Sequence, residues 1–201
     1  MTEKTIIVGP SQARREIAET LAAAFQDDPS LCWLMPDAEL RRRRLLPFFR
    51  LVTQEDQLAG MALIAPSFEV ATLWRSPGRQ KDNPLGALWT NLRFLWVLRS
   101  AVSRGSEIAK AMAQHHPSGD HWYLRYAGVA PEAQGKGWGG LALREGIRRA
   151  DGDNMPIYLE TAKLSNVSLY QRFGFEVIEE WDVPSGGPHF WSMMRHPSQP
   201  A

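Results

Sequence analysis

The chain has 201 residues, of which 44% are hydrophobic and 22% are charged, and its formal net charge at pH 7 is +1. These values fit one globular domain spanning residues 1–201, and they disfavour nucleic acid or an anionic membrane as a partner because no global field attracts either. The single cysteine, Cys32, excludes an internal disulfide framework. The N-terminus lacks the apolar core of a signal peptide, and polar residues interrupt the apolar stretch at 85–102, so a cytoplasmic location is the default expectation.

The first 120 residues alternate between strand-like and helix-like segments. Ser11 precedes an apolar stripe and is expected to cap a helix, and Pro47 is expected to kink or divide a second helix that begins after Asp37. In chain order the expected elements are a strand at 5–8, a helix that ends at 27–29, a loop at 30–36, the helix after Asp37, a hairpin of strands 59–65 and 69–74, a loop at 76–83, a helical stripe at 85–96 and a helix at 103–113.

The remaining residues continue this alternation. In chain order the expected elements are a strand at 122–129, a helix at 141–150, a strand at 157–161, a helix at 165–172, and a hairpin of strands 175–181 and 189–195. Gly174 follows the last helix and is expected to form its C-terminal cap. This order of strands and helices is typical of a mixed α/β sheet.

A glycine-rich turn, Gln134-Gly-Lys-Gly-Trp-Gly-Gly140, lies between the strand at 122–129 and the helix at 141–150. Glycine allows sharp turns and a close approach of the backbone to a ligand. The first N–H groups of a helix have no intrahelical partner, and the helix dipole favours an anion at this end. The segment therefore predicts a cradle for phosphate oxygens.

Two nucleotide motifs compete for this turn. A P-loop requires Ser or Thr after its lysine, whereas Lys136 is followed by Gly137, so this interpretation fails. Gly135, Gly137 and Gly140 match the dinucleotide pattern G-x-G-x-x-G, and Glu160 lies about where a ribose-binding acid is expected. However, Pro131-Glu132-Ala133-Gln134 lie between the strand and the first glycine, and too little chain follows for a doubly wound sheet.

A third interpretation uses the sequence around the turn. Gln134 begins a Q-x-x-G-x-G pattern, which is preceded by GVAPEA and followed by ETAKLSNVSLYQRFGF. Here the chain resembles the GNAT superfamily of acyl-coenzyme A N-acyltransferases, which carries [RQ]-x-x-G-x-[GA] after its fourth strand and an Asn-x-x-x-Tyr helix after its fifth. It is most similar to the puromycin N-acetyltransferase type, and the motifs are densest at residues 122–195. The resemblance implies a mostly antiparallel, twisted central sheet with helices on both faces and splayed fourth and fifth strands.

The resemblance also implies an acyl-coenzyme A co-substrate, usually acetyl-CoA. The backbone amides of residues 134–139 would bind the pyrophosphate, with a charge-assisted contact from Lys136. The backbone near Gly128 and Val129 would pair with the pantetheine amides like an added strand. Trp138 departs from the small aliphatic residue common at its position, and it would pack either under the cofactor or against a helix. The implied cofactor-binding residues are Gly128, Val129, Gln134, Gly135, Lys136, Gly137, Trp138, Gly139 and Asn166.

Two residues are candidates for proton transfer. Tyr170 lies four residues after Asn166, on the same helix face, and would protonate the departing thiolate. A phenol pKa of roughly 10 and a thiol pKa of roughly 8.5 make this transfer nearly balanced. Glu160 is the candidate base, or orients a water that takes the amine proton; its alternative role is a structural carboxylate. The weaker candidates are His116, His121 and His189, and their spacing predicts no metal site.

The function that follows is transfer of an acetyl group from acetyl-CoA to a primary amine of a small molecule by direct attack. Two alternatives remain: a binding module that senses acyl-CoA without chemistry, and a nucleotide-dependent oxidoreductase. The loop with Trp33 and Met35 is expected to form an apolar wall of the acceptor cleft, and the run at 41–44, four arginines, is expected to be a solvated face. The sequence leaves open whether the protein is a monomer or a homodimer.

Overall fold

The computed structural model describes residues 4–78, 97–98 and 101–197, and within them the strands form one seven-stranded sheet of order β1-β2-β3-β4-β5-β7-β6. The helical stripe expected at 85–96 lies outside the described residues. The strands are β1 (Ile7–Val8), β2 (Gly60–Ile64), β3 (Val70–Arg75), β4 (Trp122–Val129), β5 (Ile157–Thr161), β6 (Glu176–Asp182) and β7 (His189–Arg195). Both expected hairpins, β2–β3 and β6–β7, are confirmed.

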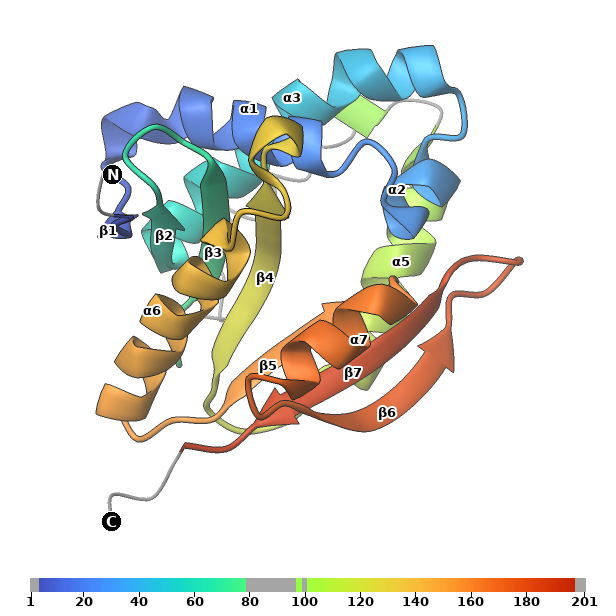
Figure 1. The fold of residues 1–201 in the computed structure, drawn as a ribbon. Helices are drawn as coiled ribbons and strands as arrows, with labels where there is room; N and C mark the ends of the chain where they lie inside the picture. Colours follow the sequence, from blue (N-terminus) through green and yellow to red (C-terminus); the bar gives the residue numbers. More distant parts are fainter. Residues whose placement is uncertain (1–3, 79–96, 99–100, 198–201) are drawn as a thin grey trace.

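The sheet is antiparallel except between β4 and β5, which run parallel. Only two residue pairs join these strands, Trp122 with Ile157 and Tyr123 with Tyr158. Beyond them β4 continues to Val129 and β5 to Thr161 without pairing, and Figure 1 shows the two strands diverging from their shared lower end. The mixed sheet with splayed fourth and fifth strands is therefore confirmed.

A β-bulge interrupts β4 where the splay begins. Leu73 of β3 pairs with Tyr126 while the next residue, Trp74, pairs with Leu124, so Arg125 is the extra residue in β4. Its guanidinium donates from Nη1 to Asp56 Oδ1 at 2.8 Å. Asp56 belongs to helix α3 (Ala38–Ala59) and is fully buried. We infer that this buried ion pair fixes the bulge and with it the direction in which β4 leaves β5.

Helices cover both faces of the sheet (Figure 1). Because strand residues alternate between faces, Ala62 and Ile64 pack with α1 and α3, whereas Met61 and Leu63 pack with α6. The α-helices of the described ranges include α1 (Arg14–Ala24), α2 (Pro29–Leu34), α3 (Ala38–Ala59), α5 (Val102–His115), α6 (Trp138–Gly152) and α7 (Leu164–Gln171). None of the helices in the described part of the chain has the length and apolar character needed to cross a membrane.

Helix α6 lies very close to the sheet because Gly146 has no side chain. A Cβ at this position would lie 2.0 Å from the ring of Trp74, which is fully buried. Any larger residue would push the helix away from β3. This packing fixes the distance between α6 and the sheet, and so the position of the N-terminal end of α6 and of the loop before it beside the end of β4.

The segment at 30–36 is not the loop that the sequence predicted. It contains helix α2, whose N-cap Asp28 accepts hydrogen bonds from the N–H groups of Ser30 and Leu31, with Pro29 in the first turn. Met35 is 1% exposed and belongs to the core, so it does not form a wall of a cleft. Pro29 therefore marks the start of α2 as well as the end of the preceding helix.

The expected helix cap at Ser11 is wrong. Ser11 begins a 3-10 turn (Ser11–Ala13), and its hydroxyl donates to Gln12 Oε1, while the helix starts at Arg14. Helix α3 runs through Pro47, so the proline does not divide it. Pro47 is half-buried next to the buried Phe48 and Phe49, whose packing offsets the lost hydrogen bond.

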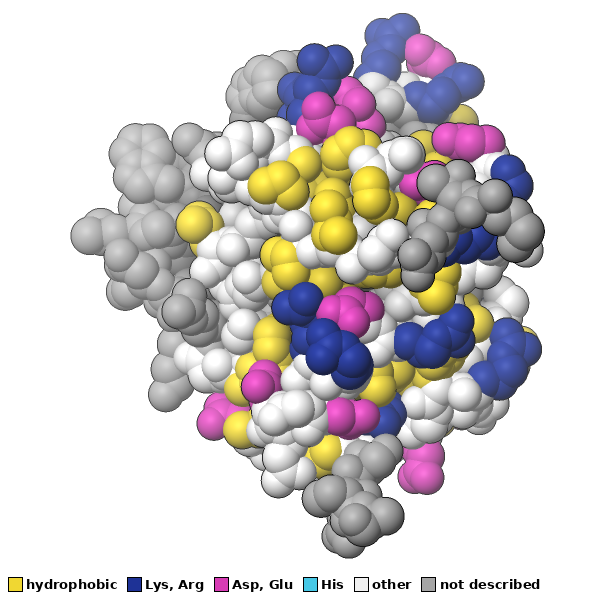
Figure 2. Space-filling model, turned by 60° about the vertical axis from the view of Figure 1, so that its left-hand side comes forward, with side chains coloured by type: hydrophobic (Ala, Val, Ile, Leu, Met, Phe, Trp, Pro, Cys, Tyr) yellow, Lys and Arg dark blue, Asp and Glu magenta, His cyan; other side chains and the backbone are white. Residues whose placement is uncertain are grey.

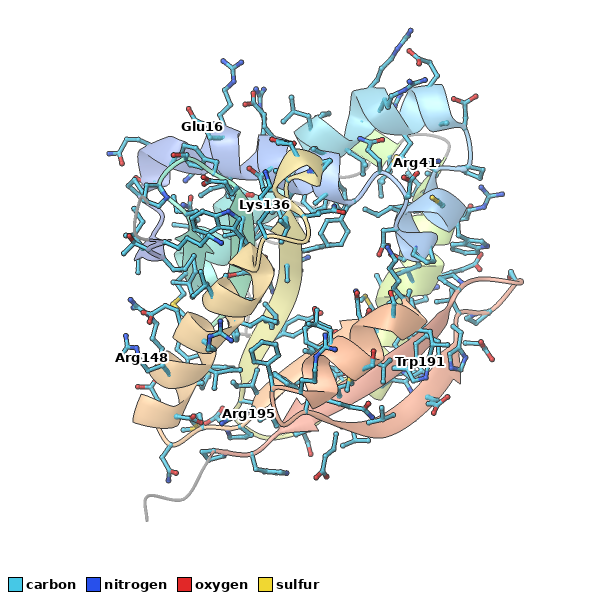
Figure 3. The ribbon with its side chains drawn as sticks, viewed as in Figure 1. Glu16, Arg41, Lys136, Arg148, Trp191 and Arg195 are labelled. Carbon is cyan, nitrogen blue, oxygen red and sulfur yellow. The ribbon has the colours of Figure 1, made fainter. Side chains whose placement is uncertain are left out.

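The arginine run at 41–44 is only partly a solvated face. Arg42 and Arg43 pair with Glu39 at the surface, as expected. Arg41 is 8% exposed and donates to three backbone carbonyls, those of Gln26, Met35 and Pro36. It therefore joins the ends of α1 and α2 to α3. Figure 3 shows Arg41 where these helices meet.

Candidate active site

The glycine-rich loop has the conformation expected of a phosphate cradle. Gly135 and Gly137 have positive φ angles of +73° and +84°, and no other atom lies within 4 Å of where their Cβ atoms would be. Backbone conformation, not space, therefore requires glycine at both positions. Among the described residues, no backbone carbonyl accepts from the N–H groups of residues 135–140, so six consecutive donors remain available for an anion.

Contacts at both sides hold this loop in place. The side-chain amide of Gln134 donates to the carbonyl of Val129 at 3.3 Å, which ties the loop to the end of β4. From the N-terminus, the Lys4 ammonium donates to the carbonyl of Lys136 and lies 5.4 Å from the centroid of the Trp138 ring. Lys4 was missed by sequence reasoning because it is 132 residues away along the chain.

Trp138 and Gly139 orient the first turn of α6. The Trp138 ring packs with Val70, Ala142 and Val129, so its side chain serves the core while its N–H belongs to the cradle. A Cβ on Gly139 would lie 3.2 Å from a methyl group of Val129. Lys136 is exposed on the loop at the N-terminal end of α6 (Figure 3), where its side chain can reach an anion.

Gly128 serves helix packing rather than a bulge. A Cβ here would lie 2.9 Å from Ala24 and 3.0 Å from Leu21, both on α1. The bulge lies at Arg125 instead. The unpaired backbone edge of β4 from the bulge to Val129 faces the splay, and it remains available to an extended ligand.

Helix α7 brings Asn166 and Tyr170 next to β5. Asn166 donates from Nδ2 to Thr161 Oγ1 at 3.3 Å, at the end of β5. Tyr170 is 8% exposed and packs against Phe175 with ring centroids 5.7 Å apart, on the face covered by α6. Burial, with a smaller contribution from the charge of Asp28, raises the pKa of Tyr170 to about 12.

Glu160 lies on the other face, two residues beyond the last β5 residue that pairs with β4. Its side chain is 2% exposed, and Oε1 is buried without a hydrogen-bond partner among the described residues. The phenols of Tyr123 and Tyr158 lie beside the carboxylate; burial, followed by the charge of Glu160, raises the pKa of both tyrosines. The carboxylate therefore lies in a buried polar group of two phenols, beside the point where β4 and β5 separate.

Two of the three candidate histidines lie next to Glu160. His116 Nδ1 is 3.7 Å from Glu160 Oε1, and His116 Nε2 is 3.2 Å from His121 Nε2. His121 Nδ1 is 2.9 Å from the carbonyl oxygen of Gly119. His189 is remote from this group, because it pairs with Asp182 and Glu180 on the β6–β7 hairpin.

The described residues contain no group of three or more His, Cys, Asp or Glu side chains that could hold a metal ion. On the face in Figure 2, basic and acidic side chains lie next to one another around hydrophobic patches, in keeping with the small net charge.

A loop of free N–H groups beside two separating strands, with a buried carboxylate on one face and a phenol on the other, defines an acyltransferase of the GNAT type. Residues 11–175 match the Acetyltransferase (GNAT) family, so the chain belongs to this family. Members of the family bind acetyl-CoA.

Individual relatives agree with this assignment. An uncharacterized N-acetyltransferase of Schizosaccharomyces pombe is 26% identical over 180 residues, covering 80% of this chain and 70% of the relative. The solved structure of a histone acetyltransferase HPA2 and related acetyltransferase from Corynebacterium glutamicum has a TM-score of 0.74 and 25% identity, covering 100% of this chain and 99% of that one. Arylalkylamine N-acetyltransferase 2 from Aedes aegypti has a TM-score of 0.61 and 12% identity, covering 98% and 100%, which is a likeness of fold alone.

Proposed function

We propose that this protein transfers the acetyl group of acetyl-CoA to a primary amine of a small molecule by direct attack, without a covalent enzyme intermediate. The observation that carries the proposal is the position of Glu160. Its carboxylate is buried, has an unpaired oxygen, and lies where β4 and β5 separate. An acyl donor in the splay would present its thioester beside this group.

The coenzyme would be held mainly by backbone groups. The free N–H groups of residues 135–140 offer donors for the pyrophosphate, and Lys136 and Lys4 add positive charge at the same loop. The unpaired edge of β4, including Gly128 and Val129, would bind the pantetheine amides, and Asn166 would contact the arm from α7. Gln134 keeps the loop closed through its bond to Val129.

Glu160 would take the proton of the attacking amine. An alkylammonium has a pKa near 10, so it must lose a proton before nitrogen can attack a thioester. The carboxylate accepts this proton directly or through one water molecule. The neutral nitrogen then attacks the thioester carbonyl carbon, and the amide C–N bond forms as the thioester C–S bond breaks. The second proton of the nitrogen goes to the departing sulfur, so the products are the amide and the free thiol of coenzyme A.

Tyr170 would act on that thiolate from the opposite face. Its raised pKa, about 12, keeps the phenol neutral and able to donate at any physiological pH. The same shift makes complete transfer to a thiolate of pKa roughly 8.5 uphill by about 5 kcal/mol. Transfer of the phenol proton is then less favourable than the nearly balanced transfer expected from the sequence, and we propose that Tyr170 stabilises the developing thiolate mainly by donating a hydrogen bond.

A small drug-like amine is the acceptor class that we propose. The support is the sequence resemblance to the puromycin N-acetyltransferase type, which is densest at residues 122–195. Trp33, half-buried on α2 with the Arg104 guanidinium 5.6 Å above its ring, is the aromatic residue we place at the acceptor side.

The proposal is tested by incubating the purified protein with acetyl-CoA and a panel of aminonucleosides, arylalkylamines and polyamines, while free thiol release and acetylated product are measured. We expect amine-dependent thiol release that Glu160→Gln reduces at least about 10²-fold. His189→Gln, which alters a histidine far from the splay, is the matched control and should retain activity. Coenzyme binding without product from any amine would instead indicate a binding module that senses acyl-CoA.

A further inference from the structure

The hydrogen-bond geometry around His121 fixes its tautomer. A carbonyl oxygen can only accept, so His121 Nδ1, 2.9 Å from Gly119 O, carries the proton. His121 is 1% exposed, and burial lowers its pKa, so the ring is neutral at physiological pH. A neutral imidazole protonated at Nδ1 has an unprotonated Nε2, which is an acceptor.

This tautomer determines the proton on His116 as well. The two Nε2 atoms are 3.2 Å apart, and since that of His121 accepts, that of His116 must donate. His116 Nδ1 then either carries a lone pair or, in the imidazolium, a second proton. His116 Nδ1 is therefore the ring nitrogen whose protonation can still change.

His116 Nδ1 faces Glu160. The distance to Oε1 is 3.7 Å, and this oxygen is the buried carboxylate atom without a hydrogen-bond partner among the described residues. At 3.7 Å the two atoms are just beyond hydrogen-bond distance, so a small movement of the imidazole would bring Nδ1 within reach of Oε1 for a proton to pass between them.

The other groups around His116 do not compete for this proton. The rings of Tyr158 and Tyr123 lie 5.0 and 5.1 Å away, edge-on, and burial raises the pKa of both phenols, which keeps them neutral. His115, the last residue of α5 and the one before His116, pairs with Glu179 of β6. The negative charge of Asp120, the residue before His121, only partly offsets the lowering of the His121 pKa by burial. The His116 side chain itself is 25% exposed, which gives it access to solvent that Glu160 lacks.

We propose that His116 is the proton acceptor for Glu160 and that His121 is a positioning residue that presents His116 in the required tautomer. This inference rests on the proposed function, in which Glu160 takes the amine proton. That proton passes from the Glu160 carboxyl group to His116 Nδ1, and the imidazolium then releases a proton to solvent, so Glu160 is ionised again for the next turnover. Without His116 the buried carboxyl group would keep the proton.

The first test does not depend on turnover. Nitrogen-15 NMR of histidine-labelled protein reports which ring nitrogens carry protons. We expect His121 protonated at Nδ1 alone, and His116 protonated at Nε2 or at both nitrogens across neutral pH. A neutral His116 protonated at Nδ1 alone would overturn the inference, whether or not the protein acetylates any amine tested.

The second test uses variants in the amine-dependent thiol-release assay. We expect His116→Gln to lower kcat about 10²-fold without changing the KM for acetyl-CoA. His121→Gln keeps an acceptor near Nε2 and should retain more activity than His121→Leu, which has none. Full activity in His116→Gln, or equal activity in the two His121 variants, would overturn the relay.

The same assay separates this inference from the proposed function. If Glu160→Gln retains full turnover, Glu160 is not the base and the proposed function itself is wrong in that respect. If Glu160→Gln is impaired while His116→Gln is fully active, only the relay is wrong. Thermal unfolding of each variant checks that a loss of activity does not reflect loss of the fold.

Discussion

Glu160 and Tyr170 project from opposite faces of the sheet at the place where β4 and β5 separate. Glu160 alternates with Leu159, which shares a hydrophobic cluster with Tyr170, so the carboxylate points to the other side, toward His116. In the proposed reaction, a group bound in the splay would be approached by the Glu160 carboxylate from one face and by the Tyr170 hydroxyl from the other.

The first prediction concerns Glu160→Gln. Glutamine has nearly the same shape but cannot accept the amine proton, so kcat should fall about 10²- to 10⁴-fold, with little change in the KM for acetyl-CoA. Because the wild-type carboxylate is buried with one oxygen unpaired, the variant should unfold at the same or a higher temperature. Steady-state kinetics and thermal unfolding check both statements, and an unchanged kcat would exclude Glu160 as the base.

The second prediction concerns Tyr170→Phe and its dependence on pH. A phenol with its pKa raised to about 12 stays protonated below that pH, so wild-type Tyr170 can donate throughout the range from pH 6 to 9 that an assay covers. We expect kcat to fall about 10²-fold in the variant and by the same factor at every pH in this range. A defect that disappears toward pH 9 would mean that Tyr170 acts in another way.

The third prediction compares two glycines at the two ends of α6. Gly137 has φ +84°, where alanine is strained by roughly 1–2 kcal/mol, so Gly137→Ala should distort the cradle and weaken acetyl-CoA binding. Gly152 has no atom within 4 Å of its Cβ position and no positive φ. Gly152→Ala should therefore bind acetyl-CoA as the wild type does and be slightly more stable. Calorimetric titration of both variants decides this, and equal affinities would argue against the cradle.

The fourth prediction concerns the ion pairs below the bulge. Asp56 is fully buried and accepts from Arg75 at 2.7 Å and from Arg125 at 2.8 Å. Asp56→Asn removes the nearer carboxylate from two guanidinium groups, which keep only Glu55 Oε2 at 3.5 Å, so the free energy of unfolding should fall by about 3–5 kcal/mol. Glu39→Gln, which breaks exposed pairs with Arg42 and Arg43, should change it by less than about 1 kcal/mol. Urea unfolding measures both, and a small effect at Asp56 would refute the anchoring role.

Local patterns predicted the C-terminal half well. Hydrophobic periodicity and glycine spacing within short windows predicted the strand that ends at Val129, the glycine-rich turn before α6 and the strand that carries Glu160. The left-handed Gly174, φ +82°, also lies where the sequence indicated the end of α7. These features depend on near neighbours along the chain, which is the information that a single sequence contains.

The features that were missed depend on distant contacts. Nothing local distinguishes Arg41 from Arg42, yet only Arg41 is buried against three carbonyls. The bulge at Arg125 is set by the register with β3. The contact of Lys4 with the glycine-rich loop joins segments that are 132 residues apart in the sequence. Helix α2 was the exception, because the cap at Asp28 was visible but was interpreted only as the end of α1.

The most direct test of the account is calorimetric titration of the wild-type protein with acetyl-CoA, with NADH and ATP as controls. The free N–H groups of residues 135–140 and the unpaired edge of β4 should bind acetyl-CoA, since both the phosphates and the pantetheine arm find partners. NADH and ATP lack that arm and should bind much more weakly. Tighter binding of either nucleotide, or no binding of acetyl-CoA, would contradict the proposed acetyl-CoA-dependent transfer.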